Sequence, residues 1–265
     1  MVATTPGGRH PAAADGRSWR VERFAVLPST NDAALDRARA GDPGQLWIVA
    51  DRQTSGRGRR GRVWVSETGN LFASALLIDP CEPMHLAELP FVAVTAARRA
   101  VAAHVARGDS RVKIKWPNDL LVDGRKVAGI LLESTKIADG RTAVAVGIGI
   151  NCKEAPAATE TPATSLLACG CSVLPEMLFD DLAEALARML ATWETGFGFG
   201  AVRNEWLGHA VGLGGPIRVR RVDGEEHGIF EAIDTAGRLV LRTADGGRRT
   251  ISAGDVFFPD GRGTE

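Results

Sequence analysis

The chain has 265 residues, of which 45% are hydrophobic and 24% are charged, and its 32 basic residues balance its 32 acidic ones. This length suffices for one core and a small second domain. The zero net charge argues against a protein built to bind nucleic acid or membrane surfaces. Because every apolar run is far shorter than the roughly 18 residues of a membrane span, and no signal-peptide pattern occurs, we expect a soluble, cytoplasmic protein.

The cysteines and histidines give no sign of a metal site. The four cysteines include one Cys-Gly-Cys pair but lack the paired two-residue spacing of a zinc site, and the five histidines are scattered without ligand spacing. We interpret the cysteines as reduced thiols that pack in the core. The sequence therefore predicts no metal held by the protein itself.

The first third of the chain predicts helices and strands in alternation. Residues 1–17 are rich in Ala, Gly, Pro and Thr and predict a disordered tail. Side-chain oxygens in Ser29-Thr30-Asn31-Asp32 can cap a helix that follows them. The pattern then predicts ordered structure from 19–24, a helix at 33–40, strands at 46–50 and 70–78, and a helix within 84–106 whose first turn holds Pro90.

The middle of the chain predicts short strands joined by hairpins. Turns at Asp123-Gly124 and Asp139-Gly140 separate apolar runs, which makes the sheet mixed or antiparallel rather than doubly wound. Two helices follow, with apolar residues at i, i+3 and i+4. The predicted strands are 112–115, 120–122, 126–134 and 142–151, and the predicted helices are 175–197 and 201–207.

The character of the sequence changes near Val211, where helical patterns give way to short strands separated by turns. Such strands indicate a small barrel. We therefore predict one domain over 18–211 and a second over 212–265. The strands of the second domain are predicted at 216–222, 228–233, 239–243 and 249–251.

A loop over 53–64, which we call the arginine loop, interleaves arginines with glycines. Glycine lets a backbone approach an oxyanion closely, and arginine supplies planar donors that match phosphate and carboxylate. A solvated basic turn, or a segment that binds nucleic acid without sequence preference, would have the same composition. The apolar flanks 46–50 and 63–65 read as strands and favour a ligand loop instead. Its charged and glycine residues are Arg57, Arg59, Arg60, Arg62, Gly56, Gly58 and Gly61.

Two further patterns point to a ligand site. The turn after Lys115 holds Pro117, so that Lys115, Asn118 and Asp119 lie at fixed angles where a lysine can face a developing oxyanion; an ordinary strand-ending turn is the simpler explanation of these residues alone. Glycines inside apolar strands weaken the strands unless a ligand or a crossing helix approaches the backbone. These glycines are Gly129, Gly147 and Gly149.

Taken in order, these segments resemble the biotin protein ligases from about Phe24 to the end of the chain. The resemblance implies an α+β fold: a mixed-sheet catalytic domain of the biotin/lipoate ligase type, similar to class II aminoacyl-tRNA synthetases, with a small C-terminal SH3-like barrel. The matching segments are Ser29-Thr30-Asn31, Gln53, Gly56 to Gly61, Trp64, Asn70-Leu71, Lys115 to Asp119, Lys126 to Ile130, Gly147 to Asn151, Thr164 to Leu166, Gly237 to Leu239 and Ser252 to Asp255.

The resemblance also implies an activity. ATP and biotin would form biotinyl-5′-AMP, with Mg²⁺ carried by the ATP phosphates, and a lysine of a biotin carboxyl carrier protein would accept the biotinyl group. The implied catalytic residues are Lys115, Arg57 and Arg59. The implied biotin-binding residues are Ser29, Thr30, Asn31, Gln53, Gly56, Arg57, Arg59, Lys115, Gly129, Gly147 and Gly149, and those for ATP or the adenylate are Arg59, Arg60, Trp64, Asn118, Lys115 and Asn151. Lys113 and Lys126 carry less weight, because a solvated neighbour explains either.

Many bacterial relatives carry an N-terminal DNA-binding domain that makes them repressors. Because few residues precede the first motif, we expect a ligase without repressor activity, and a monomer or weak homodimer. We also expect the arginine loop to be disordered in the free enzyme. A lipoate or octanoate transferase is the nearest alternative, and a nucleic-acid-binding module that uses the arginine loop is a second.

Overall fold

The computed structural model describes residues 19–157 and 159–259, so the predicted tail over 1–17 lies outside the described residues. Seven strands form one mixed sheet in the order β1-β2-β3-β7-β6-β5-β4, in which β1 and β2 are parallel and all other neighbours are antiparallel. This confirms the predicted mixed sheet. The strands are β1 Arg20–Leu27, β2 Leu46–Gln53, β3 Leu71–Ile78, β4 Val112–Lys115, β5 Asp119–Val122, β6 Arg125–Lys136 and β7 Thr142–Ile150.

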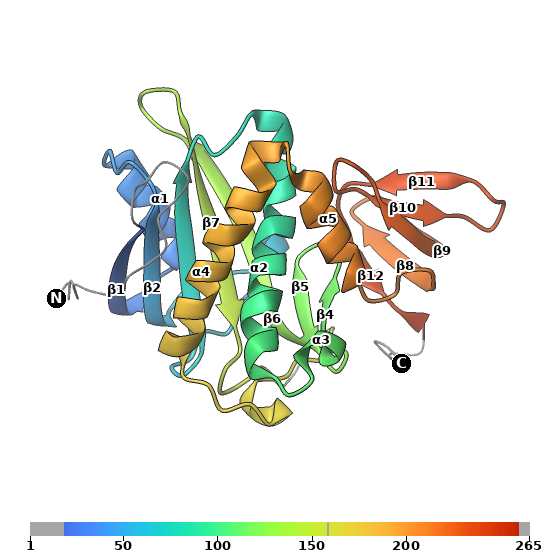
Figure 1. The fold of residues 1–265 in the computed structure, drawn as a ribbon, viewed down its shortest axis with the longest axis horizontal. Helices are drawn as coiled ribbons and strands as arrows, with labels where there is room; N and C mark the ends of the chain where they lie inside the picture. The colour runs from blue at the N-terminus through green and yellow to red at the C-terminus, as the bar shows by residue number, and fades with distance from the viewer. Residues whose placement is uncertain (1–18, 158, 260–265) are drawn as a thin grey trace.

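Helices cover both faces of this sheet. Helices α2 (Leu89–His104) and α4 (Pro175–Trp193) lie side by side across one face (Figure 1), and α1 (Thr30–Arg39) packs on the other. Alternate residues of β2 divide between the two layers, as the strand period requires. Trp47 and Val49 pack with α2 and α4, whereas Leu46 and Ile48 pack with α1.

Local chemistry accounts for the helix boundaries. Ser29 has an extended backbone, and its side chain accepts a hydrogen bond from the backbone N–H of Asp32, so that α1 starts at Thr30 rather than at the predicted residue 33. Helix α2 holds Pro90 in its first turn, as predicted. Helix α4 ends at Trp193, earlier than predicted, because Glu194 and Thr195 adopt left-handed backbone angles.

The C-terminal strands form a second, antiparallel sheet in the order β11-β10-β9-β8-β12. Its outer strands, β11 and β12, are not hydrogen-bonded neighbours in that order, so the strands form an open sheet rather than a closed ladder. The short strand β12 was not predicted, because three residues are too few to show the alternation of apolar and polar residues that identifies a strand. The strands are β8 Pro216–Arg221, β9 Gly224–Ile233, β10 Leu239–Arg242, β11 Arg248–Ile251 and β12 Asp255–Phe257.

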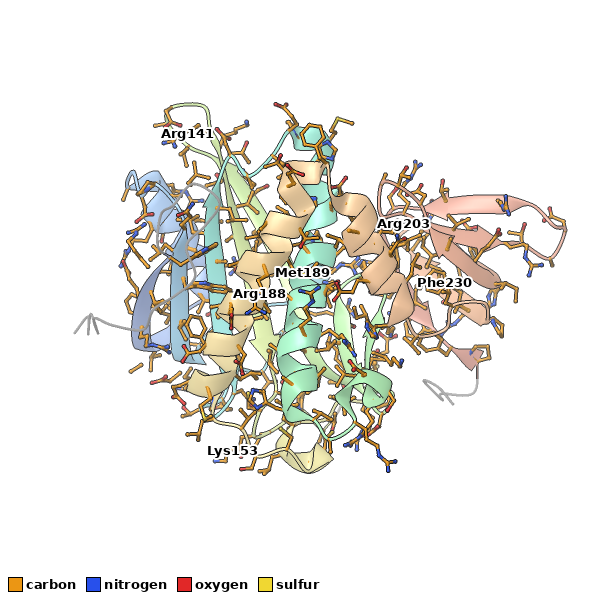
Figure 2. All side chains as sticks on the ribbon, viewed as in Figure 1. Arg141, Lys153, Arg188, Met189, Arg203 and Phe230 are labelled. Carbon is orange, nitrogen blue, oxygen red and sulfur yellow. The ribbon has the colours of Figure 1, made fainter. Side chains whose placement is uncertain are left out.

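Helix α5 (Phe199–Gly208) joins the two sheets. Trp206 of α5 packs against Phe91 of α2 and Phe230 of β9, with ring centroids 5.5 and 6.4 Å apart. Arg203 donates a hydrogen bond to the carbonyl oxygen of Ile233, at the junction visible in Figure 2. One continuous core therefore runs through both sheets. The predicted domain boundary near Val211 stays a prediction.

The predicted strand at 63–65 does not form: Val63 makes only an isolated bridge to Arg57 and is 83% exposed, so this prediction was wrong. The short helix α3 (Gly108–Arg111) precedes β4. Within the part of the chain that the structure describes, no helix is long and apolar enough to cross a membrane.

Candidate active site

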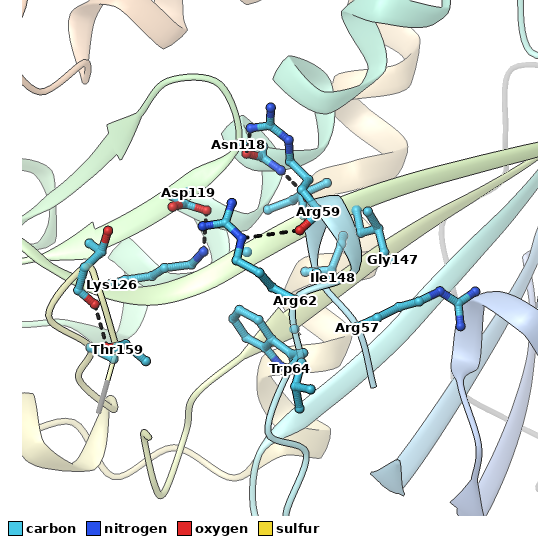
Figure 3. Close-up of a pocket in the computed structure, with 18 of the residues that line it drawn as sticks. Arg57, Arg59, Arg62, Trp64, Asn118, Asp119, Lys126, Gly147, Ile148 and Thr159 are labelled. Atoms are coloured by element: carbon cyan, nitrogen blue, oxygen red, sulfur yellow. Dashed lines mark hydrogen bonds and ion pairs between the residues drawn. The ribbon is translucent and has the colours of Figure 1, made fainter. Parts of the chain in front are cut away.

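A cavity of about 420 Å³ opens on the sheet face that carries α1, beyond the first turn of that helix. Its lining residues run from Ser29 near the start of the described chain to Phe257 near its end. Figure 3 shows the part lined by Arg57, Trp64, Asn118 and Lys126. Gly56 and Arg60 are the only predicted site residues that do not line it. Those that do are Ser29, Thr30, Asn31, Gln53, Arg57, Arg59, Trp64, Lys115, Asn118, Gly129, Gly147, Gly149 and Asn151.

Glycines form the cavity floor. Gly129 and Gly149 face each other across β6 and β7, and the Trp64 ring lies on them. A Cβ at Gly149 would come within 2.6 Å of the Trp64 Nε1, and a Cβ at Gly147 within 2.5 Å of the Asn31 Oδ1. The glycines therefore make room for Trp64 and Asn31, which bring an aromatic face and an amide against bare backbone.

A chain of polar groups forms one wall. The Gln53 Oε1 accepts hydrogen bonds from the backbone N–H of Thr30 (2.8 Å) and from its hydroxyl (3.1 Å). The Ser74 Oγ lies 2.7 Å from the Thr30 Oγ1 and 2.6 Å from the Asn31 Oδ1. Sequence patterns did not identify Ser74, because a single serine in an apolar strand forms no motif. These bonds fix which donors and acceptors the wall offers.

The stem of the arginine loop is anchored by carboxylates. Gly56 is pressed against Ser66 and the Trp64 carbonyl, with no room for a side chain and no cavity surface. The Arg57 guanidinium donates to both oxygens of Asp32 and both oxygens of Glu133, at 2.5–3.0 Å. These hydrogen bonds, Asp32 first, raise the pKa of Arg57, and Arg57 lowers that of Asp32. Figure 3 shows Arg57 pointing away from Arg59 and Arg62, toward α1.

The tip of the loop contacts the C-terminal sheet instead. Arg60 and Arg62 each donate to one oxygen of Asp255 at 3.0 Å. Arg59 donates to the Asn118 Oδ1 at 3.2 Å, and burial lowers its pKa. Burial also acts on Asp255, where it raises the pKa, but Arg62 and Arg60 outweigh it and leave the pKa lowered. Asp255 lies in the unpredicted strand β12, which is why sequence reasoning missed its contribution.

Two lysines lie at this end of the cavity. Lys115 is 6% exposed, donates to the Thr161 hydroxyl at 3.2 Å, and has its Nζ 5.5 Å from the centre of the Phe257 ring. Burial lowers the pKa of Lys115, against an opposing effect of Asp119. Lys126 also lines the cavity, paired with Asp119 at 2.6 Å and lying 5.4 Å from the Trp64 ring. Lys126 is therefore part of the cavity lining, although the sequence alone gave it little weight.

The two predicted asparagines are held by the backbone. Asn118 donates its amide to the Ile130 carbonyl, and Asn151 donates to the Thr164 carbonyl at 3.1 Å. Both are nearly buried. Their remaining polar atoms therefore have fixed directions at the cavity wall.

The cavity contains carboxylates, but they are paired with cations. Asp119 pairs with Lys126, Glu160 with Arg220, and Asp255 with Arg60 and Arg62. These pairs leave no free carboxylate cage among the described lining residues. A divalent cation fits here only as a companion of phosphates, which the surrounding arginines and lysines would also attract.

Comparisons with known proteins agree with this geometry. Residues 23–151 match the Biotin/lipoate A/B protein ligase family, and residues 212–258 match the Biotin protein ligase C terminal domain. A biotin–acetyl-CoA-carboxylase ligase of Paracoccus denitrificans is 47% identical over 243 residues, which cover 89% of this chain and 99% of that protein. A bifunctional ligase/repressor BirA of Bacillus spizizenii is 33% identical, over 86% of this chain and 71% of that protein.

Solved structures show the same fold. A biotin protein ligase from Aquifex aeolicus in complex with biotin and ATP superposes with a TM-score of 0.74 at 24% identity, covering 89% of this chain and 97% of that one. A biotin protein ligase from Leishmania major in complex with biotinyl-5-AMP gives 0.61 at 27% identity, covering 88% and 98%. The predicted fold class and resemblance are confirmed, and the chain belongs to the biotin protein ligase family.

Proposed function

We propose that this protein is an ATP-dependent biotin protein ligase that modifies a lysine of a biotin carboxyl carrier protein. The observation that carries the proposal is the division of the cavity into an uncharged polar end and a positively charged end. One end has the uncharged donors and acceptors of Thr30 and Gln53, which suit the ureido ring of biotin. The other end has Arg59, Lys115 and Lys126, which suit a carboxylate meeting a triphosphate.

In the first half-reaction, the carboxylate oxygen of biotin forms a bond to the α-phosphorus of ATP, and the bond to the pyrophosphate leaving group breaks. Charge gathers on the phosphate oxygens, where Lys115 and Arg59 stabilise it and Arg60 approaches once it leaves Asp255. Mg²⁺ carried by the ATP phosphates would supply further neutralisation of this charge, beside Lys115 and Arg59. We assign Trp64, Asn118 and Asn151, which line the cavity, to contacts with the nucleotide.

In the second half-reaction, the amine of the carrier lysine attacks the acyl carbon, AMP leaves, and the amine loses a proton. Lys115 acts as an electrostatic catalyst in both steps rather than as a covalent nucleophile. Ser29, Asn31 and the glycine floor complete the biotin end of the site. Because two carboxylates already hold the Arg57 guanidinium, we assign Arg57 to holding the loop stem rather than to binding phosphate.

The test is incubation of the purified protein with ATP, Mg²⁺, biotin and a biotin carboxyl carrier domain, followed by the intact mass of the carrier. We expect a biotin-sized gain in mass, slowed roughly 100-fold or more in Lys115→Ala, as for loss of one preorganised charge at a transition state. Lys126→Ala run in parallel measures the share of the second lysine. Transfer of lipoate or octanoate in place of biotin would refute the substrate, and no transfer at all would refute the ligase.

We also propose that this chain has no repressor activity, since its charges balance and Arg57, Arg60 and Arg62 of the loop are paired with carboxylates. Fluorescence anisotropy with labelled duplex DNA, with and without biotin and ATP, is the check. Sequence-specific binding that appears with the ligands would contradict this proposal and leave the ligase proposal intact.

A further inference from the structure

Glu133 is a partly buried carboxylate of β6 that stands between the arginine loop and α1. Its Oε1 accepts a hydrogen bond from the Arg57 Nε at 3.0 Å, and its Oε2 accepts from the Arg57 Nη2 at 3.0 Å and from the Asn31 Nδ2 at 2.8 Å. Three donors thus converge on two oxygens. An ionised carboxylate satisfies such a set because it only accepts hydrogen bonds.

The bond from Glu133 fixes the direction of the Asn31 amide. The Asn31 Nδ2 has two acceptors, the Glu133 Oε2 and the Leu131 carbonyl at 3.3 Å. The Asn31 Oδ1 consequently points the other way, toward Gly147 and the Ser74 hydroxyl. Asn31 is 4% exposed, so water cannot supply a substitute partner if the amide turns over.

The orientation of this amide also affects the hydrogen-bonding groups of the cavity wall. The Ser74 hydroxyl has one proton, which it shares between two acceptors, the Asn31 Oδ1 and the Thr30 Oγ1. The Thr30 hydroxyl and backbone N–H then share Gln53 as a neighbour. A chain of five residues therefore runs from Glu133 to the polar groups that line the cavity: Glu133, Asn31, Ser74, Thr30 and Gln53.

We propose that Glu133 is a positioning residue for the ring of the bound acid, acting through the amide of Asn31. Glu133 does not line the cavity and touches no substrate in this arrangement. Its effect is to hold the donors and acceptors of Thr30 and Gln53 in one pattern, while its bonds to Arg57 hold the loop stem beside them. The inference rests on the proposed function, because the ring-bearing acid is taken to be biotin.

The first test is Glu133→Gln, which keeps the shape but replaces one acceptor by an NH₂ group, so that one of the three donors meets another donor. We expect the KM for biotin to rise roughly tenfold or more, with kcat and the KM for ATP within about twofold of the wild type. Glu205→Gln is the matched control, because Glu205 of α5 binds Arg99 through both oxygens at 2.7 and 2.6 Å outside the cavity. Equal rises in the KM for biotin and ATP, or the same rise in the control, would overturn the inference.

A double-mutant cycle separates positioning from general loosening. If Glu133 acts through Asn31, Asn31→Ala alone should raise the KM for biotin. Adding Glu133→Gln to that variant should then raise this KM little further. Full additivity of the two changes would refute the route through Asn31. Melting temperatures of all variants show whether each is folded.

Calorimetric measurement of biotin binding to the wild type and to Glu133→Gln tests the proposed function and the role of Glu133 separately. Weaker binding by the variant supports the inference. Absence of binding by the wild type would refute the proposed function, whereas equal binding by wild type and variant would refute the role of Glu133 alone.

Discussion

At the scale of single residues, the site depends on charges held in partly dry surroundings. Lys115 is buried and Arg59 is partly buried, and burial lowers the pKa of each. An attractive charge is stronger where water is excluded, so this burial favours binding of an anion. The same burial disfavours the protonated form of Lys115 in the free protein, which makes its charge sensitive to alkaline pH.

Lys115 should therefore give the enzyme an alkaline limit. Its folded pKa lies below the ordinary value of 10.5, so kcat/KM for ATP should start to fall at a pH below that value. Stability should change in the opposite direction: between the folded pKa and 10.5 the unfolded state binds more protons, so stability rises with pH. Lys115→Arg, which stays charged, should remove this limb from the pH profile of kcat/KM. An identical alkaline limb in that variant would assign it to another group.

At the scale of elements, the arginine loop is held at two places by different parts of the fold. Asp32 and Glu133 hold its stem through Arg57, and Asp255 of β12 holds its tip through Arg60 and Arg62. The tip contacts are ion pairs at the surface, which are weak individually. The stem pairs contain four hydrogen bonds, against two at the tip. Opening should therefore begin at the tip.

Limited trypsin digestion measures this opening, because trypsin cleaves after exposed arginines. We expect Asp255→Asn to be cut in the loop roughly two- to fivefold faster than the wild type, the range for loss of a surface pair. Biotin with ATP should slow cleavage in both, because ligands bound in the cavity would hold the loop closed over them. Asp123→Asn, which breaks a surface pair with Arg111, is the control. A wild-type loop resistant without ligands would contradict disorder of the free loop.

The same elements show what the sequence could and could not predict. Alternating apolar residues and Gly turns identified most strands, and the interleaved arginines and glycines identified the loop. The strand at 63–65 was wrong because Val63 has side-chain alternation but no neighbouring strand to pair with. Glu133 and Ser74 were missed because their importance comes from partners about 43 to 102 residues away, which no local pattern contains.

At the scale of the whole molecule, the C-terminal sheet is part of the site rather than an appendage. Asp255, Val256 and Phe257 line the cavity, and Trp116, beside Lys115, donates its indole N–H to the Gly237 carbonyl at 3.2 Å. The aromatic contacts of Trp206 continue the core from α2 into β9. Folding of the two sheets should accordingly be coupled.

Calorimetry should show one unfolding transition for both sheets. Phe230→Ala removes a fully buried ring from the junction and should destabilise the protein by about 3–5 kcal/mol, lowering the single transition without splitting it. Val222→Ala, at a residue that is 94% exposed, is the control and should change little. Two resolved transitions in the wild type would show that the sheets unfold independently.

The glycine floor limits how the substrate range of this protein can be altered. The strand that carries Gly147 and Gly149 turns its other side to the core, where Val146 and Ile148 are 1–2% exposed. Lowering the floor would disturb that packing, and adding any side chain to the glycines would strike Asn31 or Trp64. A library meant to accept a bulkier acid should therefore vary exposed lining positions, starting with Val63 of the arginine loop and Val65 just after it, and leave both strands of the floor unchanged.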